Sequence, residues 1–156
     1  MGYVARLMTT HIFETEQWLP VPREKVFPFF ADARNLETIT PPWLNFHVLT
    51  PDEIPMQTGA LIDYQLRIRG VPVRWRTEIT VWKPPFRFVD EQRRGPYRLW
   101  RHTHTFEERD GGTYCHDRVE YAVPGGALVN WLLVRRDVEK IFAYRAAALK
   151  KHFGVK

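Results

Sequence analysis

The chain has 156 residues, which suits one domain of ordinary size and is too short for two. Hydrophobic residues make up 44% and aromatic residues 14%, which excludes a disordered chain and predicts either a core of large side chains or an aromatic-lined cavity. The formal net charge is +5, but the basic residues form no continuous block, so the sequence gives little support to nucleic-acid binding.

Cysteine content and hydropathy indicate where the protein works. Cys115 is the only cysteine, so neither an internal disulfide nor a zinc site built on several cysteines can form. The first residues lack the apolar core of a signal peptide, and no apolar run has the length of a membrane span. We therefore expect a cytoplasmic protein with no nucleic-acid partner and no stable membrane insertion. A single domain should cover residues 9–156, after a flexible segment 1–8.

The first half of the chain predicts one strand, two short helices and then further strands. Residues 11–19 are rich in aromatic and β-branched side chains and end before Pro20, as a strand before a turn does. Residues 22–40 predict two short helices, because Pro28 lies inside this segment and Pro41 follows it. Turn residues then separate six predicted strands, at 43–50, 60–69, 71–82, 86–94, 97–108 and 113–123.

Residues 127–153 predict one long amphipathic helix. Apolar side chains recur there at spacings of three and four: Leu128, Trp131, Leu132, Val138, Ile141, Phe142, Leu149 and Phe153. The element order predicts an α+β fold, in which a curved seven-stranded antiparallel sheet carries two short helices and the long C-terminal helix across its concave face. A gap between this helix and the sheet would form a cavity.

Three stretches carry a resemblance to a known family: "WRHTHTFE", "GGTYCHDRVEYAVPGG" and "IFAYRAAAL". Together with the element order they resemble the START/Bet v 1-like (SRPBCC) helix-grip superfamily, in particular small bacterial members of the polyketide cyclase/dehydrase and coenzyme Q-binding type. The likeness covers residues 10–153. It implies a helix-grip fold with a hydrophobic ligand cavity under the C-terminal helix, in a superfamily that holds carriers and a minority of enzymes.

The hairpin between residues 97 and 123 places two of its three histidines inside. A four-residue loop, 109–112, sets a register that pairs Phe106 with Cys115 and His104 with Asp117. His102 and His104 then share the inward face with Asp117, Trp100 and Tyr121, and His116 points outward. By the same alternation Tyr64, Trp75 and Val81 face inward, whereas Arg67, Arg69, Arg74 and Arg76 form an outer basic patch.

Three interpretations of the inward histidines stay open. His102 and His104 could chelate a metal ion with Asp117, but an H-x-H pair alone is weak evidence and we expect no metal or cofactor. His104 and Asp117 could form a catalytic base and its orienting carboxylate in a cyclase or dehydratase. The simplest interpretation is that these side chains give polar contacts to a ligand in a mainly apolar pocket.

We expect the protein to bind or carry a small hydrophobic molecule such as a lipid, an isoprenoid quinone or an aromatic polyketide-like compound, with cyclase or dehydratase activity as the alternative. Arg145 lies on the apolar stripe of the long helix, where it must either reach the edge along its stem or meet a carboxylate or ligand. The predicted ligand-binding residues are Tyr64, Trp75, Trp100, His102, His104, Asp117, Tyr121, Trp131, Phe142 and Arg145. The outer basic patch leaves open a third role, binding to DNA or anionic vesicles, and the sequence does not fix the oligomeric state.

Overall fold

The computed structural model describes residues 8–156, so the predicted flexible segment 1–8 lies outside the described residues except for Met8. The strands are β1 (His11–Leu19), β2 (His47–Val48), β3 (Leu61–Ile68), β4 (Val71–Lys83), β5 (Arg87–Arg94), β6 (Leu99–Arg109) and β7 (Gly112–Ala122). The helices are α1 (Arg23–Ala31), η1 (Ala33–Asn35), α2 (Leu36–Ile39), η2 (Pro42–Leu44), α3 (Gly126–Val129), η3 (Asn130–Val134) and α4 (Arg135–His152).

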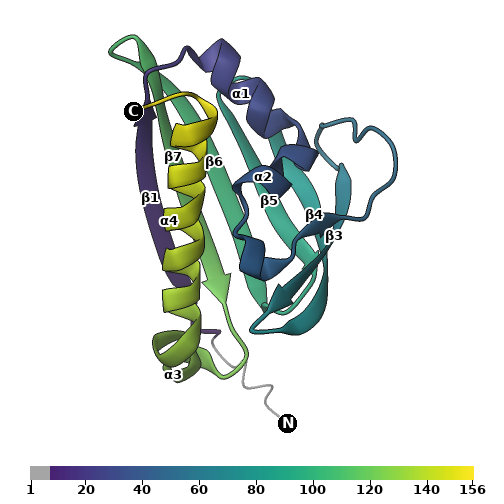
Figure 1. Cartoon of the computed structure of the whole chain (residues 1–156). Coiled ribbons are helices and arrows are strands. Elements are labelled where there is room, and N and C mark those ends of the chain that lie inside the picture. The colour runs from purple at the N-terminus through teal and green to yellow at the C-terminus, as the bar shows by residue number, and fades with distance from the viewer. Residues whose placement is uncertain (1–7) are drawn as a thin grey trace.

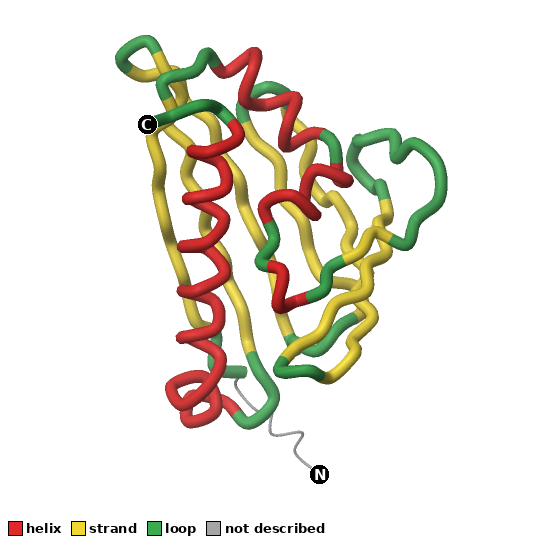
Figure 2. The backbone as a smooth tube through the Cα atoms, viewed as in Figure 1, coloured by secondary structure: helices red, strands yellow, loops and turns green. Residues whose placement is uncertain are grey.

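The strands form one seven-stranded sheet in the order β1-β7-β6-β5-β4-β3-β2, and every pairing is antiparallel. Helix α4 runs along one face of this sheet, while α1 and α2 cover the same face beside it (Figure 1). The backbone trace shows this two-layer arrangement of helices over strands (Figure 2). The predicted α+β architecture, with its long C-terminal helix, is confirmed.

The segment predicted as a strand at residues 43–50 differs from the prediction. Only His47–Val48 pairs with β3, and Pro42–Leu44 forms the short 3₁₀ helix η2. Asn45 ends that helix with a φ of 43°, in the left-handed region that breaks an extended chain. The aromatic and apolar side chains of this segment are typical of a strand, but Pro41 and Pro42 favour a helical turn at its start.

The β6–β7 hairpin has the predicted register with a shorter turn. Phe106 pairs with Cys115 and His104 with Asp117. The ladder continues to Arg109 and Gly112, so the loop is the two-residue turn Asp110-Gly111 and not residues 109–112. Both turn residues have positive φ, 52° and 74°, as the tight hairpin turn that matches strand twist requires.

An irregularity in β4 changes which side chains face inward near its end. The register with β5 shifts between Ile79 and Val81, after which Val81 pairs with Val89 and Trp82 pairs with Phe88. Trp82 therefore shares the inner face with Phe88, and their ring centroids lie 5.6 Å apart. The predicted inward position of Val81 is wrong because a bulge adds one residue to the alternation.

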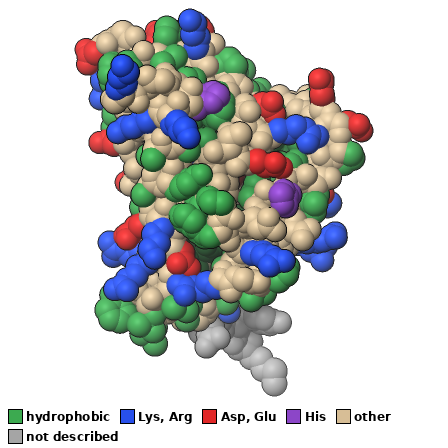
Figure 3. Space-filling model, viewed as in Figure 1, with side chains coloured by type: hydrophobic (Ala, Val, Ile, Leu, Met, Phe, Trp, Pro, Cys, Tyr) green, Lys and Arg blue, Asp and Glu red, His purple; other side chains and the backbone are tan. Residues whose placement is uncertain are grey.

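The start of the C-terminal helix also departs from the prediction. Leu128, Trp131 and Leu132 are 65%, 67% and 50% exposed, although the apolar stripe predicts that they face the sheet. The turn η3 is π-helical, and its extra residue moves the inward position from Trp131 to Asn130, which is buried. Figure 3 shows hydrophobic side chains at the surface at this α3 end of the molecule, beside Lys and Arg. No helix within residues 8–156 combines the length and apolarity needed to cross a membrane.

The buried core divides into two clusters along the helix face of the sheet. The larger cluster packs α1 residues such as Phe27 and Phe30 against Phe88, Phe106 and the end of α4. The smaller cluster includes Tyr121, Val138 and Phe142, near the start of α4. These two clusters hold α1 and α4 in place on the sheet.

Candidate functional site

A cavity of about 580 Å³ lies between the sheet, α4 and the α1–η2 segment. Its volume is typical of a site for one small organic molecule. Most of the lining side chains are apolar, and aromatic rings are prominent: Trp43, Tyr64, Trp75, Phe88, Tyr97 and Trp100. Charged and ionisable groups gather on the wall formed by β5, β6 and α4.

That polar wall is built by strand alternation on three neighbouring strands. His102 and His104 project from β6, where Asp90 of β5 pairs with His102 on one side and Asp117 of β7 pairs with His104 on the other. Because residues paired across antiparallel strands point to the same face, all four side chains meet on the inner face. The two histidines are 5% and 3% exposed, which makes them the most deeply buried part of this wall.

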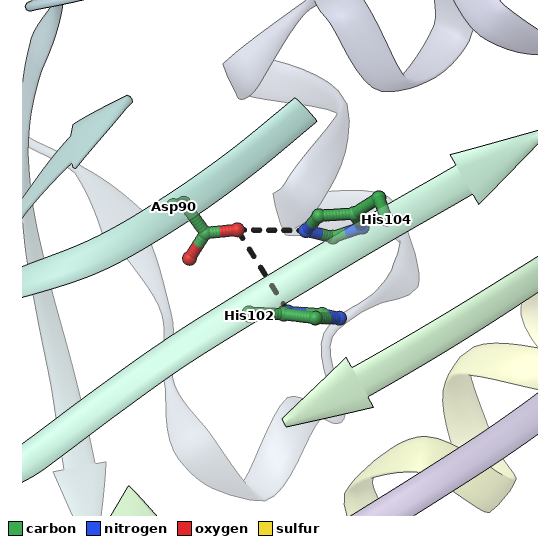
Figure 4. A group of neighbouring side chains, drawn as sticks. All are labelled: Asp90, His102 and His104. Atoms are coloured by element: carbon green, nitrogen blue, oxygen red, sulfur yellow. Dashed lines mark hydrogen bonds and ion pairs between the residues drawn. The ribbon is translucent and has the colours of Figure 1, made fainter. Parts of the chain in front are cut away.

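The four side chains are arranged in a ring, of which Figure 4 draws Asp90, His102 and His104. Nε2 of His104 lies 2.7 Å from Oδ2 of Asp90, and Nε2 of His102 lies 2.7 Å from Oδ1 of Asp117. Nδ1 of His104 lies 3.1 Å from the same oxygen of Asp117. The remaining side of the ring is wider, since Nδ1 of His102 lies 3.8 Å from Oδ2 of Asp90, too far for a hydrogen bond.

Arg145 completes the network from α4. It is 9% exposed, and its guanidinium lies 3.8 Å from the carboxylate of Asp117 and 3.5 Å from Nδ1 of His104. Of the two alternatives for this arginine, the structure therefore shows the one in which it meets a carboxylate. The rings of Phe30 and Phe142 lie 5.4 Å and 5.8 Å from the guanidinium carbon, so its apolar surroundings also fix its position.

Burial and the ring contacts act against each other on the pKa of each group. Burial would raise the pKa of Asp117, but Arg145 and the two histidines outweigh it and hold that pKa well below its usual range. Burial would also raise the pKa of Asp90, but the hydrogen bond with His104 and the nearby histidines and Arg145 outweigh burial and lower it. Burial lowers the pKa of His102 to about 4, whereas the hydrogen bonds to Asp117 and Asp90 overcome burial and raise the pKa of His104.

The network therefore brings two carboxylates, two imidazoles and one guanidinium into contact. Asp90 and Asp117 are the anions, Arg145 is a permanent cation, and at neutral pH the lowered pKa of about 4 keeps His102 neutral. Its Nε2–H donates to Asp117, which leaves a lone pair on Nδ1 at the wide side of the ring. Such a paired arrangement keeps charges beside an apolar cavity without the cost of an isolated buried ion.

The other predicted ligand-binding residues divide into two groups. Tyr64, Trp75, Trp100 and Phe142 line the cavity together with His102, His104 and Arg145. Asp117 lies behind the histidines, and Tyr121 is buried in the smaller core cluster, 6.1 Å from Trp100 between ring centroids. The expected place of Trp131 in the cavity wall is wrong, because the π-helical turn directs it to the surface.

Sequence reasoning missed Asp90. The signal for it is the strand "FRFVDEQRR", in which Asp90 follows inward Phe88 at a spacing of two. Two arginines of the predicted outer basic patch pair with carboxylates in the structure. Arg76 pairs with Asp63 at 2.8 Å, whereas Arg69 stands in the β3–β4 turn, borders the cavity and pairs with Asp137 of α4 at 3.1 Å.

One group of side chains in the described part of the chain has the composition and spacing of a metal site. The ligand atoms of Asp90, His102 and His104 all lie within 4.8 Å of one another, and these residues line the cavity. Cys115 is buried, and burial raises its pKa to about 12, which keeps it a thiol at neutral pH. Its sulfur is therefore a poor nucleophile and a poor metal ligand.

Comparison with known proteins identifies the fold. Residues 19–143 match the family model described as polyketide cyclase / dehydrase and lipid transport.

Protein Ms6760 from Mycobacterium smegmatis has a TM-score of 0.69 and 18% identity, covering 92% of this chain and 90% of that chain. Ara h 8.0201 has a TM-score of 0.69 and 17% identity, covering 94% and 99%. The major latex-like protein 151 from Panax ginseng has a TM-score of 0.69 and 9% identity, covering 92% and 97%. No curated protein matches the sequence. The predicted START/Bet v 1-like fold is confirmed.

Proposed function

The chain belongs to the polyketide cyclase/dehydrase and lipid transport family, and from this premise we propose that it binds or carries one small, oxygen-bearing aromatic molecule in its cavity. The observation that carries the proposal is the contrast within the cavity, whose lining is mostly apolar and aromatic. Its charged groups are confined to the wall of Asp90, His102, His104 and Arg145 and to the Arg69–Asp137 ion pair. Aromatic rings pack well against an aromatic ligand, and a carbonyl or hydroxyl group on that ligand would reach the polar wall.

The polar wall is needed for tight binding. Burying roughly 300 to 400 Å² of apolar ligand surface is worth about 8 to 10 kcal/mol, while association costs at least about 4 kcal/mol. The apolar contacts alone then give a dissociation constant of about tens of micromolar or weaker. A hydrogen bond from Arg145 to a ligand oxygen, or from a ligand hydroxyl to Nδ1 of His102, would add affinity and would fix the orientation of the ligand. An aromatic polyketide-like compound or a quinone supplies such an oxygen, and a simple hydrocarbon chain does not.

A cavity-filling substitution tests this proposal. Leu66 faces the cavity and Leu61, on the same strand, is 48% exposed, so Leu66→Trp should block the site and Leu61→Trp should not. Binding would be measured with the fluorescent apolar probe anilinonaphthalene sulfonate, and with mass spectrometry of molecules that co-purify under gentle conditions. We expect Leu66→Trp to weaken probe binding at least about tenfold, which corresponds to about 1.4 kcal/mol. Equal affinity of both variants would contradict the proposal.

A second candidate function is proton transfer to or from the bound molecule, as in a cyclase or dehydratase. The observation that favours it is the geometry of His102, whose Nε2 is held by Asp117 while its Nδ1 is left open at the cavity. Solvent deuterium entering the carbon beside the carbonyl of a bound ketone would be measured by NMR. Exchange that stops in His102→Gln would support this function. Exchange no faster than in buffer would exclude it.

A further inference from the structure

We propose that Asp90, His102 and His104 bind one divalent transition-metal ion at the polar wall of the cavity, with Asp117 holding both imidazoles in position from behind. Figure 4 shows the three side chains converging from β5 and β6. Two histidines spaced two residues apart on one strand project from the same face, which lets both rings reach a single ion. This inference does not depend on which molecule fills the cavity.

The wide side of the polar ring has the spacing of two ligands on one metal ion. Nδ1 of His102 and Oδ2 of Asp90 lie 3.8 Å apart. They are two electron-pair donors at a separation too large for a hydrogen bond. An ion such as Zn²⁺ binds imidazole nitrogen and carboxylate oxygen at about 2.0 to 2.2 Å, so two ligands on one ion stand about 3 to 4 Å apart. An ion there would also replace the proton between Nε2 of His104 and Asp90, where a contact of 2.7 Å needs to open only slightly.

Asp117 lies where it can orient both imidazoles toward a metal ion. Metal-bound histidines commonly donate the other ring N–H to a carboxylate, which fixes the tautomer and the ring orientation. Oδ1 of Asp117 accepts from Nε2–H of His102 at 2.7 Å and lies 3.1 Å from Nδ1 of His104. One carboxylate therefore directs the two remaining nitrogens toward Asp90. Arg145 lies on the Asp117 side of the ring, 3.8 Å from that carboxylate.

The charges favour a cation at this place. Asp90 and Asp117 bring two negative charges to a largely buried wall, and Arg145 supplies one permanent positive charge. Two imidazoles and one carboxylate suit Zn²⁺ or Fe²⁺ better than Mg²⁺ or Ca²⁺, which prefer oxygen ligands. Three protein ligands leave further positions open, and these would face the cavity. A ligand oxygen could bind there directly, so the ion would add a polar anchor to the apolar site.

The experiment uses the full chain without a polyhistidine tag, stripped with a chelator and titrated with Zn²⁺ and with Co²⁺. Calorimetry should show one ion per chain, and Co²⁺ should give visible absorption. We expect Asp90→Asn to weaken binding at least about a hundredfold and Asp117→Asn to weaken it about ten- to a hundredfold, because Asp117 acts through the histidines. His116→Ala is the matched control, since His116 lies on the same hairpin, faces away from the cavity and contacts Glu14.

The position of the ion gives a readout that does not depend on the stability of any variant. Crystals of the wild-type protein grown with Co²⁺ should show an anomalous peak between Asp90, His102 and His104. A peak elsewhere, or no binding of either ion at about millimolar concentration, would overturn the proposal. Full affinity in Asp90→Asn, or loss of binding in His116→Ala, would overturn it as well. Circular dichroism would verify that each variant is folded.

Discussion

Replacing Arg145 with Met should destabilise the protein strongly, because it removes a charge that compensates buried carboxylates. The guanidinium lies 3.8 Å from Asp117, and the two side chains are only 11% and 15% exposed. Methionine keeps the length and most of the volume of the apolar stem between Phe30 and Phe142. The substitution therefore removes charge and hydrogen bonds with little change in packing.

The size of the effect follows from the distance. Two unit charges 3.8 Å apart attract by about 4 kcal/mol at an effective dielectric constant of about 20. Breaking a buried ion pair by removing one partner costs about 3 to 5 kcal/mol in measured cases. His104 also compensates Asp117 at 3.1 Å, which reduces the loss, so we expect the free energy of unfolding to fall by about 3 kcal/mol.

Urea denaturation followed by circular dichroism measures this loss, and a double-mutant cycle assigns it. Asp117→Asn combined with Arg145→Met should lose less than the sum of the single variants, with a coupling energy of about 2 kcal/mol. Arg135→Met is the matched control on the same helix. Arg135 is 65% exposed and pairs with Glu139 at 3.0 Å, and such a surface pair contributes about 0.5 kcal/mol or less. Equal losses at Arg145 and Arg135, or additive effects in the cycle, would refute the reasoning.

Three further predictions concern single side chains. Burial raises the pKa of Cys115 to about 12, so iodoacetamide at mildly alkaline pH should leave the folded protein unlabelled and should modify it in urea; rapid labelling of the native state would contradict the buried position. Trp100 lines the cavity and Trp131 is on the surface, so Trp100→Phe should reduce the fluorescence change on probe binding while Trp131→Phe leaves it unchanged. A Cβ on Gly112 would clash with the carbonyl oxygen of Leu19, so Gly112→Ala should lower the free energy of unfolding by about 1 to 3 kcal/mol in urea; an unchanged midpoint would show that β1 and β7 separate at little cost.

The hairpin could be read from the sequence because a tight turn fixes the register of every residue that follows it. The Asp110-Gly111 turn sets the β6–β7 pairing, and alternation then separates inward His102 and His104 from outward His116. The same rule gave no position for Asp90. Its strand reaches β6 through the longer link that contains Pro96, and only the structure sets its register against His102.

Two local backbone features account for the remaining differences between the predicted and the observed side-chain positions. A π-helical turn adds one residue to the helical period, which turns Trp131 outward, and the β4 bulge adds one residue to the strand period, which brings Trp82 inward instead of Val81. Neither insertion can be recognised from the pattern of apolar residues in the sequence. The contact of Arg145 with Asp117 depends on how α4 crosses the sheet, which the periodicity of one helix does not define.

A crystal structure of the gently purified protein with a bound oxygen-bearing aromatic ligand tests the central claim most directly. We predict that the ligand lies in the cavity with its rings against Trp75 and Trp100, and with an oxygen within hydrogen-bonding distance of His102 or Arg145, or on an ion held by Asp90. A ligand bound only at the outer surface, with the cavity filled by rearranged side chains, would contradict the account.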